Sequence, residues 1–263
     1  MIGQTTFKNY LSNWKRPPQF IVLNGEVGSG RSTIIDLIKN KFKYQVVLCG
    51  TSVEEVRNIV TLSYRISDPT FYIFYSGDKL SLSSKNALLK VVEEPPQNAF
   101  FIMRTENGII ETLKNRSFYY EMQPYEFDDL KSYFVKEGKQ ELFNRYGKIC
   151  KNIGQIKVFL NSPYDDIIDY CNKIVEVINQ VSQGNIFNIP NKLNLGEDLE
   201  KWDLVLFINV LEWVLSNKYF ETKEDKYFQA IFRLNGVKSQ LKIVGVNKQS
   251  VFDNFLLGLK YLL

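Results

Sequence analysis

The first half of the chain alternates short apolar runs with longer amphipathic stretches. Apolar residues at helical spacing predict helices at residues 32–42, 53–67 and 83–94. Between them lie runs of strand length, rich in β-branched and aromatic residues, several of them apolar throughout, as in strands covered on both faces. They predict five strands, at residues 20–23, 44–49, 70–75, 99–104 and 118–122. This alternation is typical of βαβ units and predicts an α/β fold with a parallel sheet.

Beyond residue 124 the pattern changes to helices alone. Amphipathic stretches at residues 128–137 and 140–150, and a further one through Leu160, predict a small helical unit. The segment at residues 161–164 contains a proline and predicts a loop or domain link. Further helices are expected at residues 165–183, 199–216, 223–234 and 248–262, with an Asn-rich loop at 184–196. We therefore predict three domains, at residues 1–124, 125–162 and 163–263.

The composition changes this picture mainly through what it lacks. The chain has no histidine, which removes the commonest general base and the commonest metal ligand, so hydrolase and metalloenzyme functions are disfavoured. Cys49, Cys150 and Cys171 form no CxxC pair, so we expect reduced, buried thiols instead of a zinc site or disulfides. The net charge of +4 permits a nucleic-acid partner without requiring one.

Hydropathy gives no sign of a membrane partner. Hydrophobic residues make up 44% and charged residues 24% of the 263 residues, as in ordinary globular proteins. The apolar runs are far shorter than the roughly 18 residues that a membrane span needs. The first residues do not resemble a signal peptide. We therefore expect an intracellular, cytoplasmic protein.

A glycine-rich segment links the first predicted strand to the first predicted helix. Residues 25–33 read GEVGSGRST, close to the phosphate-binding pattern GxxxxGK[ST], in which backbone N–H groups and a helix N-terminus surround an anion. Arginine stands at the lysine position, and its longer, forked guanidinium fits such a loop differently. The alternative is a glycine-rich turn without a ligand. The candidate nucleotide-binding residues are Gly25, Gly28, Gly30, Arg31, Ser32 and Thr33.

A P-loop ATPase also needs a carboxylate at the end of another apolar strand, where it helps to hold Mg²⁺. The candidate strand at residues 70–75 instead leads into Tyr75, Ser76, Gly77 and Asp78. Asp78 could be a displaced magnesium ligand, but a turn or helix-capping role is favoured for a carboxylate in this position. We expect no metal site and no ATP hydrolysis by the chain alone.

The next segment resembles the clamp-loader subunits of bacterial DNA polymerase III, which are AAA+ proteins. Residues 78–96 read DKLSLSSKNALLKVVEEPP, similar to the NALLKxLEEPP segment of that family. Residues 99–105 resemble the sensor-1 strand, with Thr105 at the sensor position. Residues 111–117 resemble the TIxSRC segment, with Arg116 in the place of the arginine finger. The resemblance covers about residues 7 to 160 and puts Tyr75 and Ser76 where active members carry the Walker B carboxylates.

The resemblance implies a P-loop AAA+ domain followed by a helical lid and an all-helical collar for oligomerisation. It implies a delta-prime-like subunit that requires no cofactor, although ATP or ADP could occupy a degenerate site that includes Thr105. Arg116 would act in trans on a nucleotide of a neighbouring motor subunit; alternatively, it pairs with an acidic residue of its own domain. Implied partners are motor and delta-like subunits, the sliding clamp and primer–template DNA. Rival functions are a gamma-like motor ATPase that uses Arg31 and a free-standing P-loop NTPase.

Overall fold

The computed structural model describes residues 2–182, 203–240, 250–251, 254–255 and 258. The chain divides into two compact units. The first comprises Met1–Tyr133 and Asn152–Gly154, and the second comprises Phe134–Lys151 and Gln155–Leu263. The division into three domains with boundaries after residues 124 and 162 stays a prediction.

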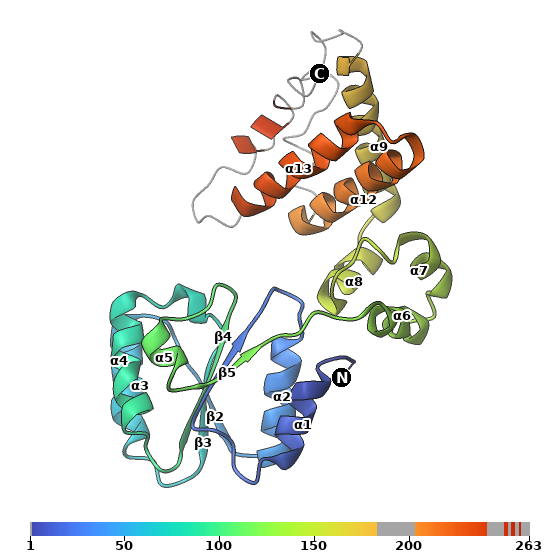
Figure 1. The fold of residues 1–263 in the computed structure, drawn as a ribbon. Coiled ribbons are helices and arrows are strands. Elements are labelled where there is room, and N and C mark those ends of the chain that lie inside the picture. The colour runs from blue at the N-terminus through green and yellow to red at the C-terminus, as the bar shows by residue number, and fades with distance from the viewer. Residues whose placement is uncertain (1, 183–202, 241–249, 252–253, 256–257, 259–263) are drawn as a thin grey trace. The chain divides into compact units, whose positions relative to one another are not determined.

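The first unit contains a five-stranded parallel sheet (Figure 1). Its strands lie in the order β2-β3-β4-β1-β5, so the carboxyl end of β1 lies between those of β4 and β5, where α/β sheets commonly bind ligands. All five predicted strands are present, and the prediction of an α/β fold is confirmed. The strands are β1 (Phe20–Asn24), β2 (Gln45–Leu48), β3 (Thr70–Phe74), β4 (Ala99–Thr105) and β5 (Phe118–Glu121).

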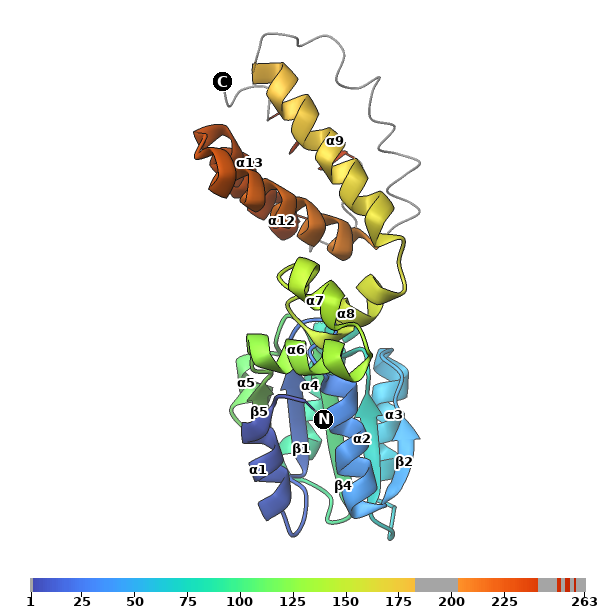
Figure 2. The same cartoon turned by 90° about the vertical axis from the view of Figure 1, so that its right-hand side faces the viewer.

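Helices cover both faces of this sheet (Figure 1 and Figure 2). Consecutive strand residues point to opposite faces, and consecutive pairs such as Ile21 and Val22 are buried in separate cores. Two-sided burial explains why the central strands read as unbroken apolar runs. One core includes α3 (Val53–Ser63), α4 (Leu82–Glu93) and α5 (Glu111–Lys114), and the other includes α1 (Thr5–Asn13) and α2 (Arg31–Phe42).

The strand β2 differs from the other strands of the sheet in its exposure. It pairs only with β3 at the edge of the sheet, and Leu48 is 68% exposed. An apolar run therefore predicts the strand correctly here, but two-sided burial does not follow from it.

Within its described residues the second unit contains helices joined by short loops and no strand. Within it α12 is apolar on nearly every side, and it packs against both α9 and α13, as a helix without a polar face must. The expected loop at residues 184–196 and most of the expected helix at 248–262 lie outside the described residues. The helices are α6 (Phe127–Lys136), which crosses the boundary from the first unit, α7 (Gln140–Tyr146), α8 (Ile153–Leu160), α9 (Tyr164–Ser182), α12 (Leu204–Thr222) and α13 (Asp225–Gln240).

The three cysteines are free thiols in apolar surroundings. Cys150 and Cys171 are buried and Cys49 is partly buried. Burial raises the pKa of Cys49 and of Cys150 to about 12, and it raises the pKa of Cys171 as well. Since the thiolate is the reactive form, these thiols are inert at neutral pH. Across the described part of the chain, no helix is both long and apolar enough to cross a membrane.

Candidate functional site

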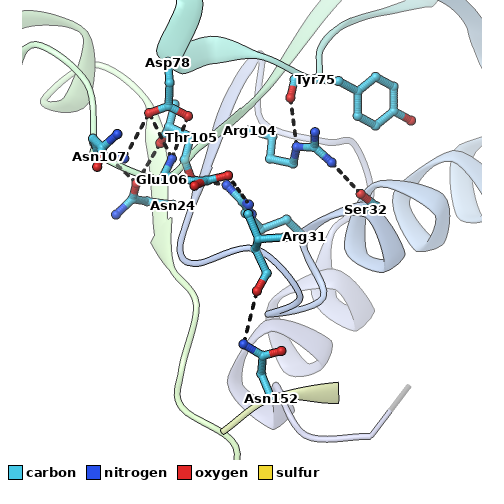
Figure 3. Close-up of polar contacts among 12 residues, drawn as sticks. Asn24, Arg31, Ser32, Tyr75, Asp78, Arg104, Thr105, Glu106, Asn107 and Asn152 are labelled. Atoms are coloured by element: carbon cyan, nitrogen blue, oxygen red, sulfur yellow. Dashed lines mark hydrogen bonds and ion pairs between the residues drawn. The ribbon is translucent and has the colours of Figure 1, made fainter. Parts of the chain in front are cut away.

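The glycine-rich loop joins the carboxyl end of β1 to the N-terminus of α2 (Figure 3). Gly28 and Gly30 have φ angles of +86° and +97°, a region that favours glycine. There is also no room for a side chain at Gly28, because a Cβ atom there would lie 2.8 Å from the Cα atom of Gly154. The strand–loop–helix arrangement that a phosphate-binding loop requires is therefore present.

Three carbonyl groups of the loop are held from outside. The Asn152 side chain donates to the carbonyl of Val27 at 3.1 Å, and the Gly154 N–H donates to the carbonyl of Gly28 at 3.2 Å. The Tyr125 hydroxyl donates to the carbonyl of Ser29 at 3.1 Å. Since C=O and N–H point in opposite directions in a trans peptide, the N–H groups that follow these carbonyls are directed away from these partners. This is the backbone orientation that an anion-binding loop uses.

Arg31, the first residue of α2, is held at the end of β4. Its side chain is only 5% exposed, and its guanidinium donates to the carbonyl of Thr105 and pairs with the Glu106 carboxylate at 3.1 Å. The buried charge of Arg31 thus has a carboxylate partner, which is itself 44% exposed. The arginine at the lysine position is therefore already occupied by partners within the chain.

A second arginine, Arg104, lies beside the first turn of α2. Its Nη1 donates to the Ser32 hydroxyl at 2.9 Å, and its Nε donates to the carbonyl of Tyr75, also at 2.9 Å. Its guanidinium carbon lies 5.3 Å from the centroid of the Tyr75 ring. Burial, and then the positive charge of Arg31, lower the pKa of Arg104. In the part of the chain that the structure describes, Arg104 forms no ion pair with a carboxylate, although the charges of Glu106 and Asp78 act on it and raise its pKa in part.

Asp78 contributes to the structure of a turn. It lies in the short helix η1 (Gly77–Lys79), and its carboxylate accepts hydrogen bonds from the N–H groups of Glu106, at 2.8 and 3.1 Å, and Asn107, at 3.0 Å. These bonds support the turn role over that of a magnesium ligand. Within the described residues, no three Cys, Asp or Glu side chains gather where they could hold a metal ion. The loop therefore fits a phosphate group, whereas magnesium, its usual companion in P-loop proteins, does not fit these residues.

Replacing Asp78 with alanine tests this role. We expect Asp78→Ala to lower the free energy of unfolding by about 1 to 3 kcal/mol, because two backbone N–H groups lose their acceptor. Urea unfolding measures the change, and Asp36→Ala, which removes only an exposed pair with Lys39, is the matched control. Unchanged stability together with an altered response to Mg²⁺ would instead favour a metal ligand.

Thr105 belongs to a polar network at the ends of three strands. Its side chain is buried, and its hydroxyl donates to the side-chain oxygen of Asn24 at 2.7 Å. The same oxygen accepts from the N–H of Gly108, while the amide nitrogen of Asn24 donates to the Glu121 carboxylate. Asn24 thus connects Thr105 at the end of β4 to Glu121 at the end of β5 through side-chain hydrogen bonds.

Arg116 follows α5 and lies apart from this network, beside the end of α4. It is 46% exposed, and its Nη2 lies 3.5 Å from Oε1 of Glu93, which is itself 52% exposed. Its Nη1 donates to the carbonyl of Thr112 at 3.1 Å. An ion pair between two half-exposed side chains is weak. Arg116 therefore pairs with an acidic residue of its own unit, but that pair is easily exchanged for another anion.

Sequence reasoning missed several polar residues of this site. Asn24 and Arg104 lie at the carboxyl ends of apolar strands, and this position could have marked them, since ligands bind there in α/β sheets. Asn152 is 125 positions from Val27, and no local pattern links the two. Thr33, which the motif did mark, lies exposed on the first turn of α2.

Comparisons with known proteins agree with this geometry. The family described as "DNA polymerase III, delta subunit" matches residues 31–126. The DNA polymerase III subunit gamma of Buchnera aphidicola from Schizaphis graminum is 26% identical over 151 residues, which cover 54% of this chain and 41% of that protein. The subunit gamma of Buchnera aphidicola from Acyrthosiphon pisum is 28% identical over 172 residues, which cover 62% of this chain and 44% of that protein. The chain thus spans less than half the length of these curated relatives.

A solved structure extends the likeness in fold to nearly the whole chain. The crystal structure of a DNA polymerase III gamma subunit-related protein from Thermotoga maritima has a TM-score of 0.54 and 18% identity, and the match covers 97% of both chains. At this identity the match shows a shared fold, a parallel α/β sheet joined to helices. In sequence, part of the chain resembles the clamp-loader subunits of bacterial DNA polymerase III.

Proposed function

We propose that the chain is a delta-prime-like clamp-loader subunit that does not hydrolyse ATP itself. One observation carries this proposal: the hydroxyl of Ser32, which in an active P-loop would bind Mg²⁺, instead accepts from the Arg104 guanidinium. Phosphoryl transfer in P-loop enzymes depends on a metal ion that neutralises the β- and γ-phosphates. A guanidinium at that position repels a divalent cation, and the strand end opposite it offers Tyr75 and Ser76 in place of carboxylates.

In this role the chain would assist a motor subunit of a hetero-oligomeric loader in the cytoplasm. The half-exposed Arg116 would serve as an arginine finger in trans, with its charge close to the nucleotide of the neighbouring subunit. The partners would be motor and delta-like subunits, the sliding clamp and primer–template DNA. The helical second unit would supply contacts for oligomerisation.

Reconstitution tests this function. We expect the purified chain to hydrolyse no ATP alone, because the Ser32 hydroxyl is bonded to Arg104 and because Tyr75 and Ser76 stand in place of the magnesium carboxylates. We also expect a complex with motor and delta-like subunits to load the clamp on primer–template DNA only when the chain is included. Loading that proceeds equally well without the chain would contradict the proposal.

A gamma-like motor ATPase is the second candidate. It is favoured by the similarity to two gamma subunits, although each match covers less than half of that protein. Turnover by the chain alone that requires Mg²⁺ and disappears in Arg31→Ala would favour this candidate over the first.

A further inference from the structure

Two arginine side chains, Arg31 and Arg104, place positive charge beside the phosphate loop. Arg104 contacts the Ser32 hydroxyl from β4, and Arg31 reaches the end of the same strand from α2 (Figure 3). The two arginines are close enough for the charge of one to lower the pKa of the other. Only Arg31 has a carboxylate partner, Glu106, among the residues that are described. Among the described residues Arg104 thus forms no ion pair of its own, although the Glu106 and Asp78 carboxylates act on its charge, and its guanidinium can bind an anion.

The loop also offers hydrogen-bond donors that point to its inner side. The carbonyls of Val27 and Ser29 are bonded from outside, so the N–H groups of Gly28 and Gly30 are directed inward. The hydroxyl of Ser29 has no hydrogen-bond partner although the residue is only 8% exposed. It faces across the loop, since a Cβ atom on Gly25 would lie 3.1 Å from it. An unpartnered buried hydroxyl has a cost in free energy that an acceptor such as a phosphate oxygen would remove.

We propose that the loop binds a di- or triphosphate group without magnesium, with the guanidinium of Arg104 in the position of the metal ion beside Ser32. A guanidinium is always charged and binds phosphate oxygens through two parallel N–H groups, so it can supply both the charge and the orientation that a metal ion would supply. The Nη2 group of Arg104 has no hydrogen-bond partner in the described part of the chain and remains available for such a contact. This inference rests on the proposed non-hydrolysing function, because a guanidinium in this position holds phosphate without activating water.

Titration calorimetry of the full chain with ADP, once in EDTA and once in Mg²⁺, tests the proposal. We expect binding in both conditions, with dissociation constants that differ by less than about tenfold. A parallel titration with pyrophosphate separates the two sources of the ligand. Equal affinity for ADP and pyrophosphate would assign recognition to the phosphates alone, and tighter binding of ADP would show that the nucleoside also contributes. No binding of either in EDTA, or binding that appears only with Mg²⁺, would overturn the inference.

Substitution of Arg104 tests whether its guanidinium is the cation that binds the phosphates. We expect Arg104→Gln to weaken ADP binding in EDTA at least about tenfold, because a charge-assisted hydrogen bond is lost. Arg57→Gln, the same change at an exposed position on α3, should leave binding unchanged. Equal binding by wild type and a folded Arg104→Gln variant would reject the role of Arg104. The comparison of wild type in EDTA and Mg²⁺ decides the metal question even if Arg104→Gln does not fold.

The outcome is separable from that of the proposed function. A chain that binds no ADP in EDTA but remains essential for clamp loading would refute this inference and leave the function intact. A chain that binds ADP without metal but is dispensable for loading would refute the function alone.

Discussion

Arg116→Ala is expected to slow ATP hydrolysis at the neighbouring motor site by about 10³-fold or more, since an arginine supplied in trans contributes on the order of 10³–10⁵ in P-loop enzymes. In the proposed role the guanidinium would stabilise negative charge that develops on the transferred phosphoryl group, and alanine would leave that charge unbalanced. The effect is measured as DNA-stimulated ATPase in a reconstituted complex where only the motor subunit next to this chain retains an intact P-loop.

The surroundings of Arg116 make the test selective. Its partners, Glu93 and the carbonyl of Thr112, are exposed, so alanine should leave the fold of the first unit unchanged. Lys114→Ala is the matched control, because Lys114 is a cation of similar exposure on α5 that pairs with Glu111 and lies over the Tyr119 ring. Arg116→Lys should give an intermediate rate, as it keeps the charge but loses the forked geometry. An unchanged rate in Arg116→Ala, with the complex intact, would remove the finger from the proposal.

The strands could be predicted from sequence because their signal is local. Strands covered on both faces must be apolar throughout, and this requirement marks β1, β3 and β4. Two helices, α1 and α5, were absent from the prediction. α5 has only four residues, and α1 buries only Phe7 and Leu11, so neither carries a full helical period of apolar positions. The exposure of β2 depends on its place at the sheet edge, which the tertiary fold decides.

The candidate site was predictable only in outline. The spacing of glycines marked the loop because backbone geometry alone requires them at Gly28 and Gly30. The partners of Arg31 and Arg104 could not be read from sequence, since Thr105 is 74 positions from the first and Ser32 is 72 positions from the second. The sequence predicted the loss of the magnesium carboxylates at Tyr75 and Ser76. It did not predict that the guanidinium of Arg104 would lie between Tyr75 and the first turn of α2.

Leu88→Ala is expected to lower the free energy of unfolding of the first unit by about 2 to 5 kcal/mol, the range for a large-to-small change in a well-packed core. Leu88 lies in the NALLK segment of α4, is fully buried and shares a core with Leu113 of α5. The matched control is Leu82→Ala in the same helix, since Leu82 is 65% exposed and its removal should cost at most about 0.5 kcal/mol. Hydrogen exchange of the β4 amides in urea reports on this unit separately from the second.

A large difference between the two leucine variants would have a consequence for how the family segment is understood. The segment that most resembles clamp loaders would then be a packing signature, because Leu88 and Val91 fill the core beneath α4 while Glu93 at its end meets Arg116. Since α5 packs on α4 through the same core, the position of Arg116 depends on this packing. Equal stability of the two variants would contradict that dependence and would show that the family-like residues of the segment do not determine the position of Arg116.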